Sequence, residues 1–312
     1  FFLGSLAQVH FRAGRSNLKG IPKPDLPRIK EVLKEGGHLM LPLVALVWML
    51  GSGLPVAHTA FYTILITIAV SWLRKSTRMG LKDIISALEE GTRQSLSTIV
   101  ACGVVGIIIA VVNLTSFGST LTAAITQVGA GSLFLTLFLT MIASIILGMG
   151  LPSIPAYIIT ATMAAPALAE FGLPILVAHL FVFYYGIFAN ITPPVALASF
   201  AAAGLSGGNA MRTSFISVRL AIAGFIVPFL FAYQPALLMV DTTNVTTNTV
   251  EFPMASIGLI LLVTITAIVG ILGLSAAIEG YFSTNLNVVE RIILGAASLG
   301  MIIPETYSTV IG

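Results

Sequence analysis

The chain has 312 residues, of which 57% are apolar and 9% are charged. Soluble domains carry about a quarter charged residues, whereas this chain has no Asp, Glu, Lys or Arg between Arg93 and Glu170. So few polar groups cannot cover the surface of a soluble fold, which excludes a cytosolic enzyme. The composition predicts an all-α polytopic membrane protein. The net charge of +3 does not indicate a nucleic-acid partner, because the basic residues gather in loops beside the membrane.

A helix that spans a bilayer needs about 20 mainly apolar residues. Such stretches predict about seven to eight transmembrane helices, at 38–53, 55–73, 96–114, 132–149, 174–190, 214–239, 255–277 and, more weakly, 288–303. The apolar runs at 118–130 and 153–169 are shorter or bounded by Gly and Pro. We expect those two runs to form partial or re-entrant helices.

The basic residues predict the orientation of the chain. Twelve of the 15 lie in the segments 12–35 and 74–93, which are separated by two predicted spans. An even number of crossings places both segments on one side, and the positive-inside rule makes that side cytoplasmic. Arg212, Arg219 and Arg291 fit the same side. The segment 241–251 has no basic residue, so we expect it to face outward.

Each basic loop also predicts a short amphipathic helix on the membrane surface. The apolar residues recur at helical spacing, at Leu26, Ile29, Val32 and Leu33 in the first loop and at Leu81, Ile84, Ile85 and Leu88 in the second. Each helix is either a solvated connector on the cytoplasmic face or a stiff arm that links a moving part to a fixed part.

The sequence lacks the motifs of several common enzyme and nucleotide-binding families. It contains no Walker loop, no dinucleotide-binding glycine motif, no HExxH and no Gly-x-Ser-x-Gly. The single cysteine, Cys102, excludes an intrachain disulfide and a cysteine-based metal cluster. An intramembrane hydrolase would need a base near Ser153, and no His or Asp is close to it in sequence. We therefore expect neither an enzyme nor a cofactor.

The segment 148–155 (GMGLPSIP) interrupts the backbone directly after an apolar span. Because proline has no N–H group, Pro152 removes the helical partner of the Gly148 carbonyl, and Pro155 removes that of Leu151. Free carbonyls at membrane depth are tolerated where they are buried in protein, line a cavity or bind a cation. The segment therefore predicts the tip of a hairpin.

A second break follows the next span, at 190–194 (NITPP). By the same rule, Pro193 frees the Ala189 carbonyl and Pro194 frees that of Asn190. A short segment rich in small residues follows at 195–204. Two interrupted segments in one half of a transporter indicate a binding site, because half-helix ends and unwound carbonyls hold ions and substrate. The alternative is that Gly and Pro merely permit kinks and close packing.

We predict one Na⁺ site between these two breaks, since Na⁺ favours oxygen ligands and the freed carbonyls supply them without a formal charge. Its expected ligands are Gly148, Leu151, Ala189, Asn190 and Thr192. The wider ion- and substrate-binding site adds Gly150, Ser153 and Val195.

Three further side chains, those of His179, Arg212 and Arg219, each allow two interpretations. His179 lies within a predicted span and is either a proton relay or a neutral, hydrogen-bonded packing residue. Arg212 and Arg219 either mark the inner boundary of a span or bind an anion. Glu170 is expected to end the hairpin helix at the membrane interface.

The two breaks carry a family resemblance. The runs 148–174 (GMGLPSIPAYIITATMAAPALAEFGLP) and 178–215, which contains ITPPVALASFAAAG, closely resemble the large membrane subunit of TRAP transporters. The resemblance is to the fused permeases of the TAXI branch in particular. It extends to 8–44, 276–282 and 290–294, so it covers nearly the whole chain.

The resemblance implies a Na⁺-coupled secondary transporter in a bacterial inner membrane, built as an elevator from two inverted repeats. A periplasmic TAXI-type binding protein would deliver a small carboxylate to it. The family often has an acidic residue at the position of Asn190, so the asparagine leaves H⁺ coupling open. The resemblance also implies that the first repeat lies upstream of Phe1, and we expect this chain to be the C-terminal part of the permease.

We accordingly predict three parts. These are a scaffold region at 1–94, a transport region at 95–240 that holds the second inverted repeat, and an outer loop with C-terminal membrane helices at 241–312. One alternative is a stand-alone ion-coupled anion transporter of the wider ion-transporter superfamily, which works without a binding protein. Another is a purely structural membrane subunit.

Overall fold

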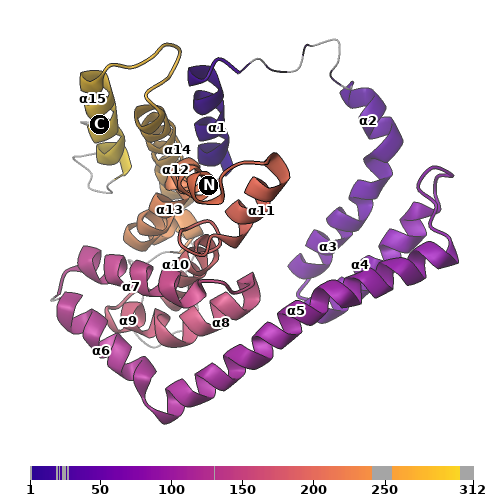
Figure 1. Cartoon of the computed structure of the whole chain (residues 1–312), viewed down its shortest axis with the longest axis horizontal. Helices are drawn as coiled ribbons and strands as arrows, with labels where there is room; N and C mark the ends of the chain where they lie inside the picture. Colours follow the sequence, from indigo (N-terminus) through magenta and orange to yellow (C-terminus); the bar gives the residue numbers. More distant parts are fainter. Residues whose placement is uncertain are drawn as a thin grey trace. The chain divides into compact units, whose positions relative to one another are not determined.

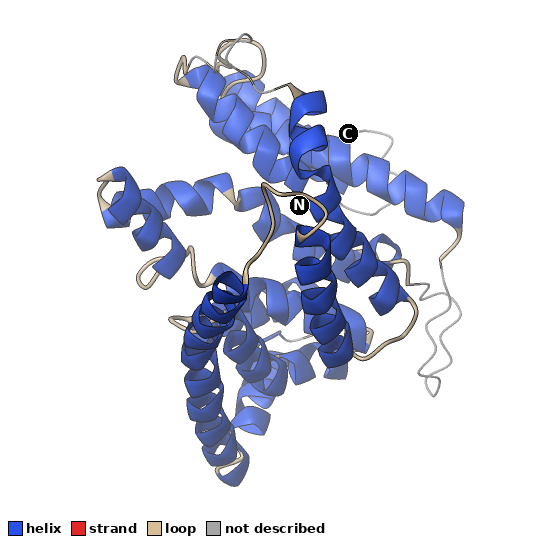
Figure 2. Cartoon of the chain, turned by 90° about the vertical axis from the view of Figure 1, so that its right-hand side faces the viewer, coloured by secondary structure: helices blue, strands red, loops and turns tan. Residues whose placement is uncertain are grey.

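The computed structural model describes residues 2–18, 20, 22, 26, 28–129, 131–240 and 255–302. Helices joined by short loops make up this part of the chain, with no β-strand element among the described residues (Figures 1 and 2). The predicted class, an all-α polytopic membrane protein, is confirmed. The chain divides into two compact units, Lys19–Ser97 and the combination of Phe1–Leu18 with Thr98–Gly312. The predicted division into scaffold, transport and C-terminal parts stays a prediction.

The smaller unit contains two antiparallel apolar segments. Helix α2 (Ile29–Gly36), the 3₁₀ turn η2 (Gly37–Met40) and α3 (Leu41–Gly51) follow one another without a loop. After a turn, α4 (Val56–Ser71) packs against α3.

The first predicted surface helix is present as the short helix α2, but the expectation that the second is also a short helix is wrong. The first, α2, continues through η2 into α3. The second is the start of α5 (Leu81–Leu114), which runs unbroken into the predicted span at 96–114. The reason is that no proline lies between 81 and 114, and a helix tolerates Gly91 at a cost of about 1 kcal/mol.

In the larger unit, the main core is built from α7 (Leu133–Gly148) and α10 (Ile175–Phe188) with residues of α9 (Ala165–Glu170) and α13 (Ile222–Tyr233), and α8 (Ser153–Met163) packs beside it. Helix α7 packs against α8, and both pack against α10. Fully buried Leu137, Phe181 and Tyr185 lie in this core. Helix α6 (Phe117–Gly129) matches the predicted partial helix at 118–130 and packs on α7.

The predicted re-entrant segment at 153–169 is two helices and not one. Helix α8 ends at Met163, and α9 (Ala165–Glu170) begins after a break at Ala164. Pro166 explains the break, because it has no N–H group to donate to the Thr162 carbonyl. Helix α9 ends at Glu170, as the sequence predicts.

A second group of helices in this unit packs on α14 (Ile257–Glu279). Helix α15 (Val288–Ile302) and the N-terminal helix α1 (Phe2–Arg15) both pack on it. Further elements of the unit are α11 (Leu197–Ser206), α12 (Ala210–Leu220), α13 (Ile222–Tyr233) and the 3₁₀ turn η3 (Pro235–Leu238).

The lengths of the helices differ from the predicted spans. Among the described residues, three segments are long and apolar enough to cross a membrane, at Ile29–Gly51, Leu81–Leu114 and Ile257–Glu279. The pair α12 and α13, bent by 40°, adds a fourth if it counts as one span. At other predicted spans the helices are shorter, with 16 residues in α4 and α7 and 14 in α10. Pro55 and Pro174 precede α4 and α10, and Gly148 is the last residue of α7. The predicted outer loop at 241–251 lies outside the described residues.

Helices α7 and α10 approach each other closely at Gly148. A Cβ atom at Gly148 would lie 2.8 Å from the Cα atom of Gly186 in α10, and closer still to the Gly186 carbonyl oxygen. Real Cβ atoms do not approach backbone so closely. The end of α7 can therefore lie against α10 only if position 148 is glycine.

We predict that Gly148→Ala destabilises the protein by about 1–3 kcal/mol, the usual cost of overpacking a well-packed core. Thermal unfolding of the purified protein in detergent measures it. The control is Gly103→Ala in α5, where a Cβ atom meets nothing within 4 Å. If Gly148→Ala unfolds at the same temperature as this control, the close contact is absent.

Candidate functional site

The structure brings the two predicted backbone breaks together. The side-chain amide of Asn190 donates a hydrogen bond to the Leu151 carbonyl, with 3.3 Å from Nδ2 to oxygen. A Cβ atom at Gly150 would lie 3.6 Å from Cγ1 of Val195. Residues from 148–155 and from 189–195 thus form one polar region between α7, α8, α10 and α11.

The first break is a tight turn. Helix α7 ends at Gly148 and α8 begins at Ser153. Gly150 has a φ of +74°, a conformation that glycine adopts without steric cost. The Leu151 N–H donates to the Gly148 carbonyl over 3.3 Å.

The second break is longer and contains a cis peptide bond between Pro193 and Pro194. Helix α10 ends at Phe188, and α11 begins at Leu197. The residue just before α11 is Ala196, which is fully buried and has a left-handed φ of +33°. A non-glycine residue in this region is strained, and such strain is most frequent at ligand-binding and switch regions.

The four carbonyls freed by proline all have new partners. The Gly148 oxygen accepts from Leu151, and the Leu151 oxygen accepts from Asn190. The Ala189 oxygen accepts from the Thr192 N–H at 3.3 Å, and the Asn190 oxygen from the Ala198 N–H at 2.9 Å. Since a carbonyl oxygen has two lone pairs, a single hydrogen bond leaves one lone pair of each oxygen unused.

The Thr192 hydroxyl makes a local hydrogen bond. It donates to the Phe188 carbonyl, with 2.8 Å between the oxygens. Because the proton is used in that bond, the remaining lone pairs of Oγ1 face other groups. Ser153, the first residue of α8, is exposed, and Val195 is half-buried. Among the described residues, no group of three or more His, Cys, Asp or Glu side chains could hold a metal ion.

His179 takes part in a local contact. Its Nδ1 atom lies 2.9 Å from the hydroxyl oxygen of Tyr157, and the two rings meet edge to face. This single hydrogen bond to a neighbouring tyrosine favours the interpretation of His179 as a neutral, hydrogen-bonded packing residue. A cavity of about 300 Å³ lies elsewhere, between α5, α6 and the hairpin helices, and Glu170 lines it.

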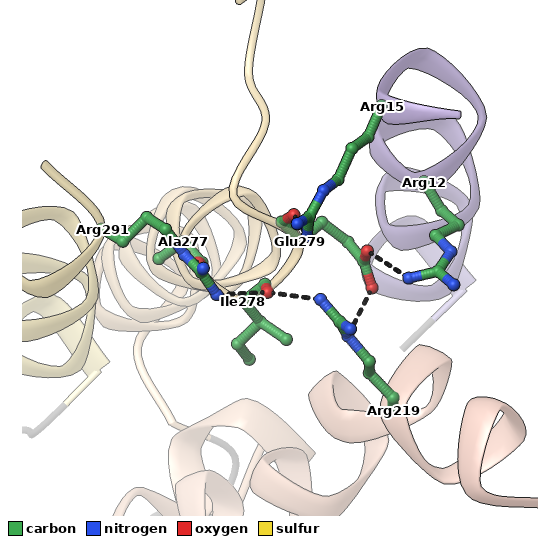
Figure 3. Close-up of polar contacts among 7 residues, drawn as sticks. All are labelled: Arg12, Arg15, Arg219, Ala277, Ile278, Glu279 and Arg291. Carbon is green, nitrogen blue, oxygen red and sulfur yellow. Dashed lines mark hydrogen bonds and ion pairs between the residues drawn. The ribbon is translucent and has the colours of Figure 1, made fainter. Parts of the chain in front are cut away.

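A second polar cluster, centred on Glu279 at the end of α14, was missed by the sequence reasoning (Figure 3). The carboxylate has no exposed surface. Arg12 of α1 lies 3.4 Å from its Oε2, and Arg219 of α12 lies 3.1 Å from its Oε1. The contact with Arg219 is an ion pair without the alignment of a hydrogen bond.

The arginines also cap α14. The last carbonyls of a helix have no helical partner. Here the carbonyl of Ala277 accepts from Arg291, that of Ile278 from Arg219 and Arg291, and that of Glu279 from Arg15. Positive charge at a helix C-terminus is also favoured by the helix dipole. We call Arg12, Arg15, Arg219, Glu279 and Arg291 the arginine cluster.

Within the arginine cluster, Arg219 pairs with the Glu279 carboxylate and caps the end of α14. Arg212 lies at the start of α12, where its N–H group donates to the side chain of Asn209. One sequence signal for the cluster was available. Glu279 is the single charged residue of α14, and it is directly followed by Gly280, which ends the helix with a φ of +68°.

We predict that Glu279→Gln destabilises the protein by about 1.5–3 kcal/mol, the usual contribution of a hydrogen bond to a charged group, because it removes the buried carboxylate that pairs with two partly exposed arginines. Chemical or thermal unfolding in detergent measures the change. The matched control is Glu89→Gln, which also loses a pair at 3.4 Å, here with Arg93, but at an exposed site. That change should cost less than about 1 kcal/mol. Equal effects of the two substitutions would show that Glu279 is not buried among the arginines.

Comparison with known families assigns the chain. A family model described as "Tripartite ATP-independent periplasmic transporter, DctM component" matches residues 1–246, well over half of the sequence. Comparisons with curated proteins and with solved structures gave no match. The predicted resemblance is confirmed at the level of the family, and this chain belongs to the DctM family, the large membrane component of TRAP transporters.

Proposed function

We propose that this chain is part of a Na⁺-coupled TRAP permease of the TAXI branch, which imports a small carboxylate across a bacterial inner membrane. The observation that carries the proposal is the hydrogen bond from Asn190 to Leu151, which holds the two broken helices side by side. Broken helices that meet are the usual sites for substrate and coupling ion in secondary transporters. A TAXI-type periplasmic binding protein would supply the substrate.

The helix ends at the two breaks suit both a cation and a carboxylate, because a helix C-terminus is partially negative and an N-terminus partially positive. Helices α7 and α10 end at the breaks, so their C-terminal carbonyls and the Thr192 hydroxyl offer oxygen to a cation. Helices α8 and α11 begin at the same breaks, and their N-termini favour a carboxylate. A neutral oxygen set suits a monovalent ion, whereas Ca²⁺ is usually bound by acidic side chains.

The main alternative is an ion-coupled carrier that works without a binding protein. The two possibilities differ in what uptake requires. A permease that depends on a binding protein receives its substrate only from that protein, whereas a stand-alone carrier takes it directly from solution.

We predict that the permease reconstituted in proteoliposomes takes up labelled carboxylate only when its binding protein and an inward Na⁺ gradient are both present. Replacing the Na⁺ gradient by a proton gradient is the control for the coupling ion. Uptake of free substrate without the binding protein would favour the stand-alone carrier. Uptake driven equally by protons would contradict Na⁺ coupling. A purely structural subunit would give no change in uptake when its breaks are mutated.

We predict that Thr192→Val raises the Na⁺ concentration for half-maximal uptake about tenfold, the effect of losing about 1.4 kcal/mol of binding. The substitution keeps the shape of the side chain and removes one oxygen. Na⁺ titration of uptake measures it, and Thr192→Ser, which retains the hydroxyl, should stay close to the unmodified protein.

The matched control is Thr92→Val in α5. The Thr92 hydroxyl also donates to the carbonyl four residues earlier over 2.8 Å, so the control loses the same local bond away from the breaks. If Thr192→Val and Thr92→Val give the same Na⁺ dependence, Thr192 is not a ligand.

A further inference from the structure

A groove lies between the two C-terminal helices of the described chain. It has a volume of about 300 Å³ and lies between α14 and α15. Apart from one residue its lining is apolar or glycine, consisting of Leu274, Ala277, Ile278, Val288, Ile292 and Gly295. The charged member of the lining is Arg291.

Arg291 is held in a fixed position at this groove. Its Nε atom donates to the Ala277 carbonyl over 2.8 Å, and its Nη2 atom donates to the Ile278 carbonyl over 2.9 Å. These bonds leave the Nη1 amino group for a further acceptor, since a guanidinium has five N–H donors. The side chain is half-buried, so it is positioned by the helix end and still accessible.

The surroundings of Arg291 carry an excess of positive charge. The arginine cluster holds four arginines and one carboxylate, that of Glu279; Arg12 and Arg219 pair with this carboxylate, whereas Arg15 and Arg291 donate to backbone carbonyls (Figure 3). The neighbouring acid on α15, Glu290, is engaged elsewhere. Its carboxylate accepts from the Asn287 N–H over 2.8 Å, and its own N–H donates to the Asn287 side chain. This reciprocal capping box belongs to the start of α15, and among the described residues Arg291 has no carboxylate within ion-pair distance.

We propose that this groove binds an anionic phospholipid, with its phosphate at Arg291 and part of one acyl chain along the apolar lining. Basic pockets between transmembrane helices on the cytoplasmic side suit anionic headgroups, and the basic loops place the arginines on that side. An acyl chain is as well solvated by the bilayer as by the groove, so selectivity comes from the headgroup. The groove distinguishes lipids by charge.

The test is native mass spectrometry of the purified permease, released from nanodiscs that contain equal amounts of phosphatidylglycerol and phosphatidylcholine. The unmodified protein should retain phosphatidylglycerol with about fivefold preference or more, the effect of about one basic residue near an anionic headgroup. Arg291→Gln should remove this preference. The charge control is Arg93→Gln on α5, whose side chain is 72% exposed, and it should leave the preference unchanged.

Since Arg291 also caps α14, a second variant keeps the guanidinium and fills the groove. Position 295 has room for a side chain, because a Cβ atom there meets only the Ala277 Cβ, at 3.7 Å. Gly295→Leu in α15 should therefore displace the lipid, whereas Gly258→Leu, at an open position near the start of α14, should not. Equal retention of the two lipids by the unmodified protein would overturn the proposal. So would an unchanged preference in both Arg291→Gln and Gly295→Leu, or displacement of the lipid by soluble glycerol phosphate.

Discussion

A backbone carbonyl at membrane depth needs a partner, because hydrocarbon offers no hydrogen-bond donor. The larger unit depends on how this constraint is met where proline interrupts its helices. Asn190 donates its side-chain amide to the Leu151 carbonyl across the two breaks, and Ala198 donates its N–H to the Asn190 carbonyl. The second break therefore supplies the donor for a carbonyl of the first. This contact joins the place where α7 ends and α8 begins to the place where α10 ends and α11 begins.

The two polar regions of the larger unit, the breaks and the arginine cluster, use different kinds of polar group. At the breaks the groups are neutral, namely carbonyls, an amide and a hydroxyl, which do not carry the desolvation cost of a formal charge. The arginine cluster uses full charges at the end of α14, with Glu279 completely buried among them. There the guanidinium groups also satisfy helix carbonyls, which lets α1, α12 and α15 meet around one helix end. The neutral region suits reversible binding, and the charged region suits permanent assembly.

Local consequences of the sequence were predictable, and long-range partners were not. The prolines at 152, 155, 193 and 194 identify both breaks, since the loss of an N–H group is a property of the residue itself. The break between α8 and α9 follows the same rule, so it could have been predicted from Pro166. The continuity of α5 was not foreseen, because amphipathic spacing at its start says nothing about where a helix ends. The pairing of Glu279 with Arg12 joins residues 267 positions apart, a distance over which no local pattern carries information.

In the proposed mechanism, Asn190 connects ion binding at the second break to the contact with the first break. Its amide nitrogen is used by the hairpin carbonyl, so its side-chain oxygen points to the other side of the same planar group. A cation bound at that oxygen would polarise the amide and strengthen the bond to Leu151, because hydrogen bonds in a chain reinforce one another. Ion binding and closure of the hairpin against the second break would then favour each other. Reciprocal coupling of this kind is what a symporter needs, since the ion must be bound before the loaded carrier moves.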